Sequence, residues 1–259
     1  MKTRLLITDV TRMSEGRVCI AAINHDRKCI RPVLIRGGIS ESWLYPRPSV
    51  VIRPFSIISL DLYRNRPQPP HTEDWFFNPK RVVFEELLEP RWREKLLTEI
   101  LDPDTASIFG AEIRTDQGYY LQEGEGSRSL GTIKVAEVER FDHNCHYDKW
   151  DYRLYFRDLA GARYHLKVTD LSLRYYVDSL RESQQIGCEE IEKRLTQEFQ
   201  HSQVYLRIGL ARHWHPDHEQ PKNRCYLQIT GVYTFPDYLG GRCFADFHPQ
   251  PSANDENLF

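Results

Sequence analysis

The chain has 259 residues, of which 40% are hydrophobic and 28% charged, a composition typical of folded globular proteins that argues against wholesale disorder. No apolar run is long enough to cross a bilayer, and the opening stretch reaches charged residues too soon for a signal peptide, so we expect a cytoplasmic protein with no membrane association. The net charge of −2 argues against strong, nonspecific binding to nucleic acid.

The charge is spread unevenly along the chain. Residues 1–70 contain 12 Lys and Arg, ten of them Arg, against five Asp and Glu, whereas residues 71–150 contain ten against 17. Arginine binds phosphate through two N–H groups and stacks on bases, so the basic segment is a candidate surface for nucleic acid. The alternative is an ordinary solvated surface that the acidic middle segment balances.

Short strands dominate the opening of the chain. Apolar and β-branched runs between turn-prone stretches predict strands over residues 5–10, 18–24 and 29–35, and a longer strand or strand pair over residues 50–63, interrupted at Pro54. Strands spaced so closely favour a meander or small barrel over βαβ units.

A proline-rich passage over residues 67–79 is expected to run as an extended loop. The stripe of Trp92, Leu96 and Ile100 then predicts a helix over residues 90–101. Residues 115–131 are rich in glycine and polar groups and are predicted to form an exposed loop.

The strand pattern resumes over residues 132–141. Alternation then predicts half-buried strands, in which apolar residues face inward and the outward positions are Arg153, Arg157, His165 and Lys167. Two helices are expected over residues 171–183 and 189–200, and two strands over residues 205–212 and 225–233. Thr8-Asp9 and Thr169-Asp170 form a short internal sequence repeat, which is expected if each half of the chain contains a similar barrel.

Two groups of residues could bind metal. His213, His215, Asp217 and His218 match the letters of the metallo-β-lactamase motif, but Pro221 stands where that motif has a glycine, and His248 is the one later histidine. We therefore favour a polar hairpin loop over a metallohydrolase.

The second group, His143, Cys145, His146 and Asp148, lacks a standard ligand spacing, and the six cysteines contain no CxxC pair, which favours buried thiols over a disulfide framework. No nucleophile elbow, kinase loop or dinucleotide fingerprint is present. We accordingly expect no cofactor and no enzymatic activity.

The last two predicted strands also suggest a binding surface. If Leu206, Ile208 and Leu210 face the core, Tyr205 and Arg207 lie on the opposite face, and the same reasoning exposes Tyr226 and Gln228. Tyrosine and arginine on one sheet face can stack bases and hold phosphates. The alternative is that these aromatic residues belong to the core.

Several segments resemble the prokaryotic dual OB-containing domain family: residues 69–75, 205–212 and 225–238, with Ile7-Thr8-Asp9 and residues 29–33. The resemblance spans nearly the whole chain. It implies a mostly β protein with a few helices, in which two OB-like β-barrels pack together. The barrels would comprise residues 1–130, with an inserted helix, and residues 131–248, with two helices, followed by a disordered tail over residues 249–259.

The resemblance further implies nucleic acid as the ligand class, brings no catalytic residues, and suggests a role in bacterial defence or DNA processing. We therefore expect a noncatalytic module for single-stranded nucleic acid. The expected phosphate contacts are Arg12, Arg31, Arg207 and Arg212, and the expected base contacts are Trp75, Tyr226 and Tyr233.

Three neighbouring residues, His71, Glu73 and Asp74, are interpreted as a clasp between the barrels, either structural or for a ligand, rather than a catalytic site. Two other functions stay open. One is an adaptor that holds a protein partner, such as a nuclease or an ATPase, and the other is a metal-dependent hydrolase built on the histidines around position 215.

Overall fold

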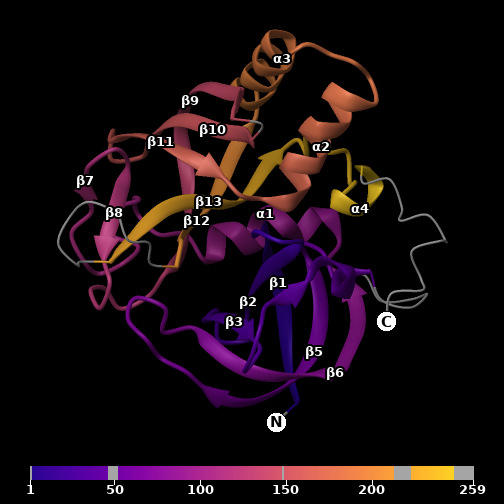
Figure 1. Ribbon diagram of the computed structural model, residues 1–259, viewed down its shortest axis with the longest axis vertical. Helices are drawn as coiled ribbons and strands as arrows, with labels where there is room; N and C mark the ends of the chain where they lie inside the picture. The colour runs from indigo at the N-terminus through magenta and orange to yellow at the C-terminus, as the bar shows by residue number, and fades with distance from the viewer. Residues whose placement is uncertain (1, 46–51, 148, 213–222, 248–259) are drawn as a thin grey trace.

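Two β-barrels, one from each half of the chain, pack against each other in the computed structural model, which describes residues 2–45, 52–147, 149–212 and 223–247 (Figure 1). The indigo and purple strands form one barrel, and the magenta to yellow strands form the other. None of the helices in these ranges is both long and apolar enough to span a membrane.

The first barrel closes because β1 pairs with both β2 and β5. The other pairings are antiparallel, except that β3 and β6 run parallel, with Arg31 opposite Asp74. The segments are β1 (Lys2–Arg12), β2 (Arg17–Ile23), β3 (Cys29–Val33), β4 (Ile39–Ser40), the 3-10 helix η1 (Glu41–Leu44), β5 (Ser56–Asn65) and β6 (Asp74–Leu87). A three-strand meander closed by two further strands is the OB arrangement.

The second barrel repeats this connectivity. Strand β9 pairs with both β10 and β12, and the third and fifth strands, β11 and β13, run parallel with Val168 opposite Ile229. Its elements are β9 (Leu130–His146), β10 (Lys149–Asp158), β11 (Arg163–Val168), α2 (Leu171–Glu182), α3 (Cys188–Gln200), β12 (Gln203–Leu210) and β13 (Arg224–Phe235). The predicted fold class, a mostly β protein with two OB-like barrels and a few helices, is confirmed.

Helices α2 and α3 lie between the third and fourth strands of the second barrel. Helix α2 begins where predicted, because the Asp170 carboxylate accepts hydrogen bonds from the amides of Ser172 at 2.8 Å and Leu173 at 3.3 Å. Its apolar stripe, which includes Val177 and Leu180, is buried in the core of this barrel.

Three details of the predicted elements are wrong. The proline-rich passage ends at Asp74, where the long strand β6 begins; the sequence pattern did not reveal this strand because much of its outer half is exposed on both faces. Helix α1 (Pro90–Glu99) follows the last strand of the first barrel and is not inserted between its strands. The predicted loop over residues 115–131 contains β8 (Tyr119–Gln122), which pairs with β13 and with the short β7 (Arg114–Thr115).

The barrels contact each other through β1 and β13. The Arg12 amide donates to the Thr169 carbonyl at 3.0 Å, and the Tyr233 hydroxyl donates to the Thr8 carbonyl at 2.5 Å. Helix α1 lies between the barrels (Figure 1), and the apolar cluster at this contact includes Phe55, Leu97, Tyr205 and Tyr233. A short helix, α4 (Phe244–Phe247), completes the described chain and packs on α2.

Candidate nucleic-acid interface

Two of the arginines expected to contact phosphate are buried between the barrels. Arg31 is 4% exposed and Arg207 is 1% exposed. The prediction that they bind phosphate directly is therefore wrong, because a guanidinium enclosed on all sides cannot reach a solvated strand. Both arginines instead form ion pairs within the protein.

Arg207 is held by groups from both barrels. Its Nε donates to Asp9 Oδ2 at 3.0 Å and its Nη1 donates to the Thr132 hydroxyl at 2.8 Å, while the Thr230 hydroxyl donates to the other oxygen of Asp9. Burial by itself would lower the pKa of Arg207, but the adjacent Asp9 carboxylate outweighs this effect and raises it. The buried guanidinium thus stays charged, and each of its three nitrogens has a partner, the third being the Cys29 sulfur at 3.6 Å.

Arg31 belongs to a second polar cluster at the start of β6. Its Nη1 lies 3.4 Å from Asp74 Oδ1 and 3.0 Å from His71 Nδ1, and its Nη2 donates to the Ser129 hydroxyl at 2.5 Å. Glu73 accepts from the Ser129 amide at 2.6 Å and from its hydroxyl at 3.0 Å. Because Ser129 directly precedes β9, these bonds join the first barrel to the start of the second.

The predicted aromatic contacts are partly or wholly covered. Tyr233 is 9% exposed and its ring packs on Phe55 with centroids 4.8 Å apart. Trp75 is half-buried against the core of the first barrel. Tyr226 is half-buried and packs on Tyr120 at 5.7 Å. Tyr233 is therefore part of the contact between the barrels, whereas Trp75 and Tyr226 are only partly accessible.

The remaining predicted cations, Arg12 and Arg212, are accessible. The side chain of each is 43% exposed. Arg212 donates to Asp74 Oδ2 at 2.7 Å, whereas Arg12 lies 3.9 Å from the Asp178 carboxylate and over the ring of Tyr175.

A groove lies on the face of the first barrel that corresponds to the ligand face of OB folds. In OB folds this face consists of the second and third strands with the loops between strands 1 and 2 and between strands 4 and 5. The groove has a volume of about 340 Å³, and residues from β2, β3 and both loops line it. The loop residues include Met13 and Arg66, and Arg212, which follows β12 of the second barrel, also lines the groove.

A second hollow of about 230 Å³ adjoins the groove. The two share Met13, Cys19 and Arg212, and the second adds Arg12 and Thr230. Because they share these lining residues, the two hollows are together called the arginine groove; Arg12, Arg66 and Arg212 are among the residues that line it.

Arg66 is the cation of the arginine groove that the sequence reasoning missed. It is exposed, lies 5.9 Å from the Phe76 ring centroid, and has no carboxylate within ion-pair distance in the described part of the chain. The sequence Arg64-Asn65-Arg66 places two arginines directly before the proline-rich passage. That passage has no function predicted from the sequence, whereas in the structure its first part is the loop between the fourth and fifth strands of an OB barrel.

The equivalent face of the second barrel has a different character. Three cross-strand pairs project outward from β10 and β11: Arg153 with Lys167, Tyr155 with His165, and Arg157 with Arg163. The charged members of these pairs lie in ion pairs with acidic residues: Asp151 holds Arg153 at 2.6 Å and Lys167 at 3.1 Å, and Glu139 holds Arg163 at 2.9 Å and Arg157 at 3.6 Å. The face is therefore a surface of mixed charge.

Some of the predicted metal-binding residues lie outside the described ranges, and the others do not form a metal site. His213, His215, Asp217 and His218 lie outside the described residues, as does Asp148. His143 is buried, stacks on Trp150 at 4.7 Å, and lies 2.8 Å from an Arg181 nitrogen, whereas Cys145 and His146 are exposed. Within the described ranges, no three His, Cys, Asp or Glu side chains are grouped so that they could hold a metal ion.

A search of curated proteins finds no match to this chain. A family model does match it: the dual OB-containing domain, over residues 3–232. This range includes every strand of both barrels except the first residue of β1 and the last three residues of β13. The chain, with its two OB barrels joined through the buried Asp9–Arg207 ion pair, belongs to the dual OB-containing domain family.

Proposed function

We propose that this protein is a noncatalytic module that binds single-stranded nucleic acid in the arginine groove of its first barrel. The observation that supports the proposal most directly is the position of Arg12, Arg66 and Arg212 in the lining of the arginine groove, on the OB ligand face. Guanidinium groups at this spacing can follow a phosphate backbone.

The arginines of the groove are available to bind a ligand, because the acidic residues near them are weak or shared partners. Asp74 is the acidic residue closest to Arg212, but it is shared with Arg31, so its charge is balanced from inside the protein. Arg66 has no such acidic partner in the described ranges, and the contact of Arg12 with Asp178 at 3.9 Å is long. Phosphate oxygens would therefore compete with weak or shared contacts.

The test is fluorescence anisotropy with labelled single-stranded DNA and RNA of about 16 nucleotides, long enough to cover one OB barrel. Three phosphate contacts on a single strand predict a slope of about −2 in log K against log salt, so affinity should fall about 20-fold between roughly 50 and 200 mM salt. Absent or salt-insensitive binding would refute the proposal.

A double variant, Arg66→Gln with Arg212→Gln, should weaken binding at least about tenfold, because each contact to a charged group contributes roughly 1.5–3 kcal/mol. The matched control is Arg153→Gln with Arg163→Gln on the second barrel, where each arginine is already ion-paired. If the control variant loses affinity and the groove variant does not, the strand binds the second barrel.

The second candidate function, an adaptor for a protein partner, is favoured by the mixed-charge face of β10 and β11. Cations paired with carboxylates around Tyr155 form a polar surface of both signs, which suits a protein better than a polyanion. A defined partner that binds the wild-type protein but not Tyr155→Ala, in the absence of nucleic acid, would support this function.

A role in bacterial defence or DNA processing, and a cytoplasmic location, stay predictions from the sequence.

A further inference from the structure

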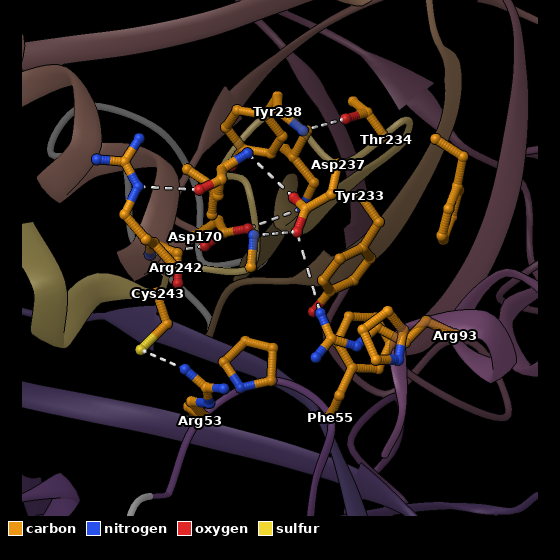
Figure 2. Close-up of a pocket in the computed structure, with 17 residues that line it drawn as sticks. Arg53, Phe55, Arg93, Asp170, Tyr233, Thr234, Asp237, Tyr238, Arg242 and Cys243 are labelled. Atoms are coloured by element: carbon orange, nitrogen blue, oxygen red, sulfur yellow. Dashed lines mark hydrogen bonds and ion pairs between the residues drawn. The ribbon is translucent and has the colours of Figure 1, made fainter. Parts of the chain in front are cut away.

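A separate cavity lies between the two barrels, away from the arginine groove. Its volume is about 180 Å³, and it is lined by residues from four separate segments (Figure 2): the loop before β5, helix α1, the start of α2, and the end of β13 with the loop that follows. Cavities of about 150 Å³ accommodate a benzene ring. The space is thus sufficient for a chemical group of that size.

Three arginines line this cavity. Arg242 donates to the Leu239 carbonyl at 3.0 Å, whereas the other two, Arg53 and Arg93, come from the opposite part of the sequence. Arg53 comes from the loop before β5, and Arg93 comes from α1. Figure 2 shows both on the side of the cavity formed by the first barrel and α1. Burial lowers the pKa of Arg93, and the positive charge of Arg53 lowers it further, against the opposing effect of Asp237.

The acceptors available to these arginines are weak. Arg53 donates to the Cys243 thiol at 3.4 Å, and it has no carboxylate within ion-pair distance in the described ranges. Arg93 donates to the Leu88 carbonyl at 3.2 Å and lies 4.0 Å from Asp237. The Asp237 carboxylate is itself occupied, because it accepts from the amides of Leu239 at 3.0 Å and Gly241 at 2.8 Å.

The cavity wall contains a strained aromatic residue. Phe55 has a φ of +68°, in the left-handed region that bulky residues rarely adopt. Two backbone bonds hold it there, one to Ile7 at 2.8 Å and one from Leu88 at 2.9 Å. The result is that its ring lies under the guanidinium of Arg93, 4.9 Å from the centroid. Strain of this kind is concentrated at ligand sites.

We propose that this cavity binds the phosphoryl group of a phosphate monoester between Arg53 and Arg93. A phosphoryl group has three oxygens and close to two negative charges, which match two guanidinium forks better than the two oxygens of a carboxylate do. The rest of the ligand would lie on the apolar wall of Phe55, Tyr233 and Leu239.

The shared chemistry, a terminal phosphoryl group, has two possible sources: a free mononucleotide, or the phosphorylated end of a short strand. Isothermal titration calorimetry at constant ionic strength, on the full chain, would use inorganic phosphate, AMP, adenosine, and a trinucleotide with and without a 5′-phosphate. The expected result is saturable binding of the phosphorylated probes and none of adenosine. Tighter binding of AMP than of the phosphorylated trinucleotide identifies a free mononucleotide, and the reverse order identifies a strand end.

Two substitutions with opposite expected effects separate binding from misfolding. Arg53→Gln should weaken AMP binding at least about tenfold, the loss expected for a hydrogen bond to a charged group. Asp237→Asn removes the negative charge next to Arg93 and should tighten AMP binding several-fold, which a damaged fold cannot produce. The matched control, Arg91→Gln, changes an exposed arginine on the same helix and should leave affinity unchanged.

The proposal does not depend on the arginine groove, and the two can fail separately. Arg66→Gln with Arg212→Gln should leave AMP binding intact while weakening the longer strand. The proposal is wrong if no phosphorylated probe binds saturably, if adenosine binds as well as AMP, or if Arg53→Gln and Asp237→Asn both bind AMP like the wild type.

Discussion

Asp9 and Arg207, 198 positions apart in the chain, form an ion pair in which both side chains are almost completely buried, with 3.0 Å between Oδ2 and Nε. Asp9 lies in the first strand of one barrel and Arg207 in the fourth strand of the other. The pair therefore joins the barrels through a charge interaction shielded from solvent.

Loss of one partner of this pair should be costly. Arg207→Met leaves the Asp9 carboxylate buried without its counter-charge, and we expect it to lower the free energy of unfolding by about 3–5 kcal/mol. Chemical denaturation would measure the change. The double variant Asp9→Leu with Arg207→Met should lose less than the sum of the single variants, and strict additivity would show that the two groups do not interact.

Glu73 should act as a structural contact between the barrels. Glu73→Ala leaves the buried Ser129 amide without its acceptor, and we expect a loss of about 2–3 kcal/mol in unfolding free energy. Glu112→Ala, at an exposed position, is the control. Affinity for single-stranded DNA should be unchanged while Glu73→Ala is folded; a folded variant that has lost only DNA binding would place Glu73 in the ligand site.

His143 should make stability depend on pH. Burial lowers its pKa, and the positive charge of Arg181 lowers it further, so the folded protein keeps the ring neutral at pH values where the unfolded chain protonates it. Stability from this group is present above about pH 6.5 and is lost as pH falls through the folded pKa, at up to about 1.4 kcal/mol per pH unit.

Urea denaturation between about pH 7 and 5.5 would measure this slope by comparing the wild type with a His143 variant. Most carboxylates stay ionised there, and Asp170, whose burial raises its pKa to about 7, contributes equally to both proteins. His143→Phe should flatten it, whereas His25→Gln, at an exposed position, should not. An unchanged slope in His143→Phe would assign the pH dependence to another group.

The salt dependence of binding should report each groove arginine separately. Arg212→Gln should reduce the slope of log K against log salt by about 0.7, the value for one lost phosphate contact on a single strand. Anisotropy titrations at several salt concentrations would measure it. A slope equal to that of the wild type would mean that Arg212 stays bonded to Asp74 and does not contact the strand.

Local patterns in the sequence predicted most of the elements. The alternation of Tyr152, Leu154 and Phe156 with polar residues is a property of a single strand, and the Asp170 cap at the start of α2 depends on residues two and three positions away. The sequence did not predict strand β6, because residues 80–86 are exposed or half-buried and their apolar and polar residues do not alternate regularly.

Local patterns were enough to predict most strands and helices and the side of each that fills its own barrel, because the two-residue period separates inner from outer positions within one strand. Which of the outer positions meet solvent depends on how the two barrels pack. Arg207 and Arg212 follow each other closely in the chain, yet the other barrel covers Arg207 and leaves Arg212 accessible. That difference depends on the packing of two distant surfaces, which no local pattern encodes.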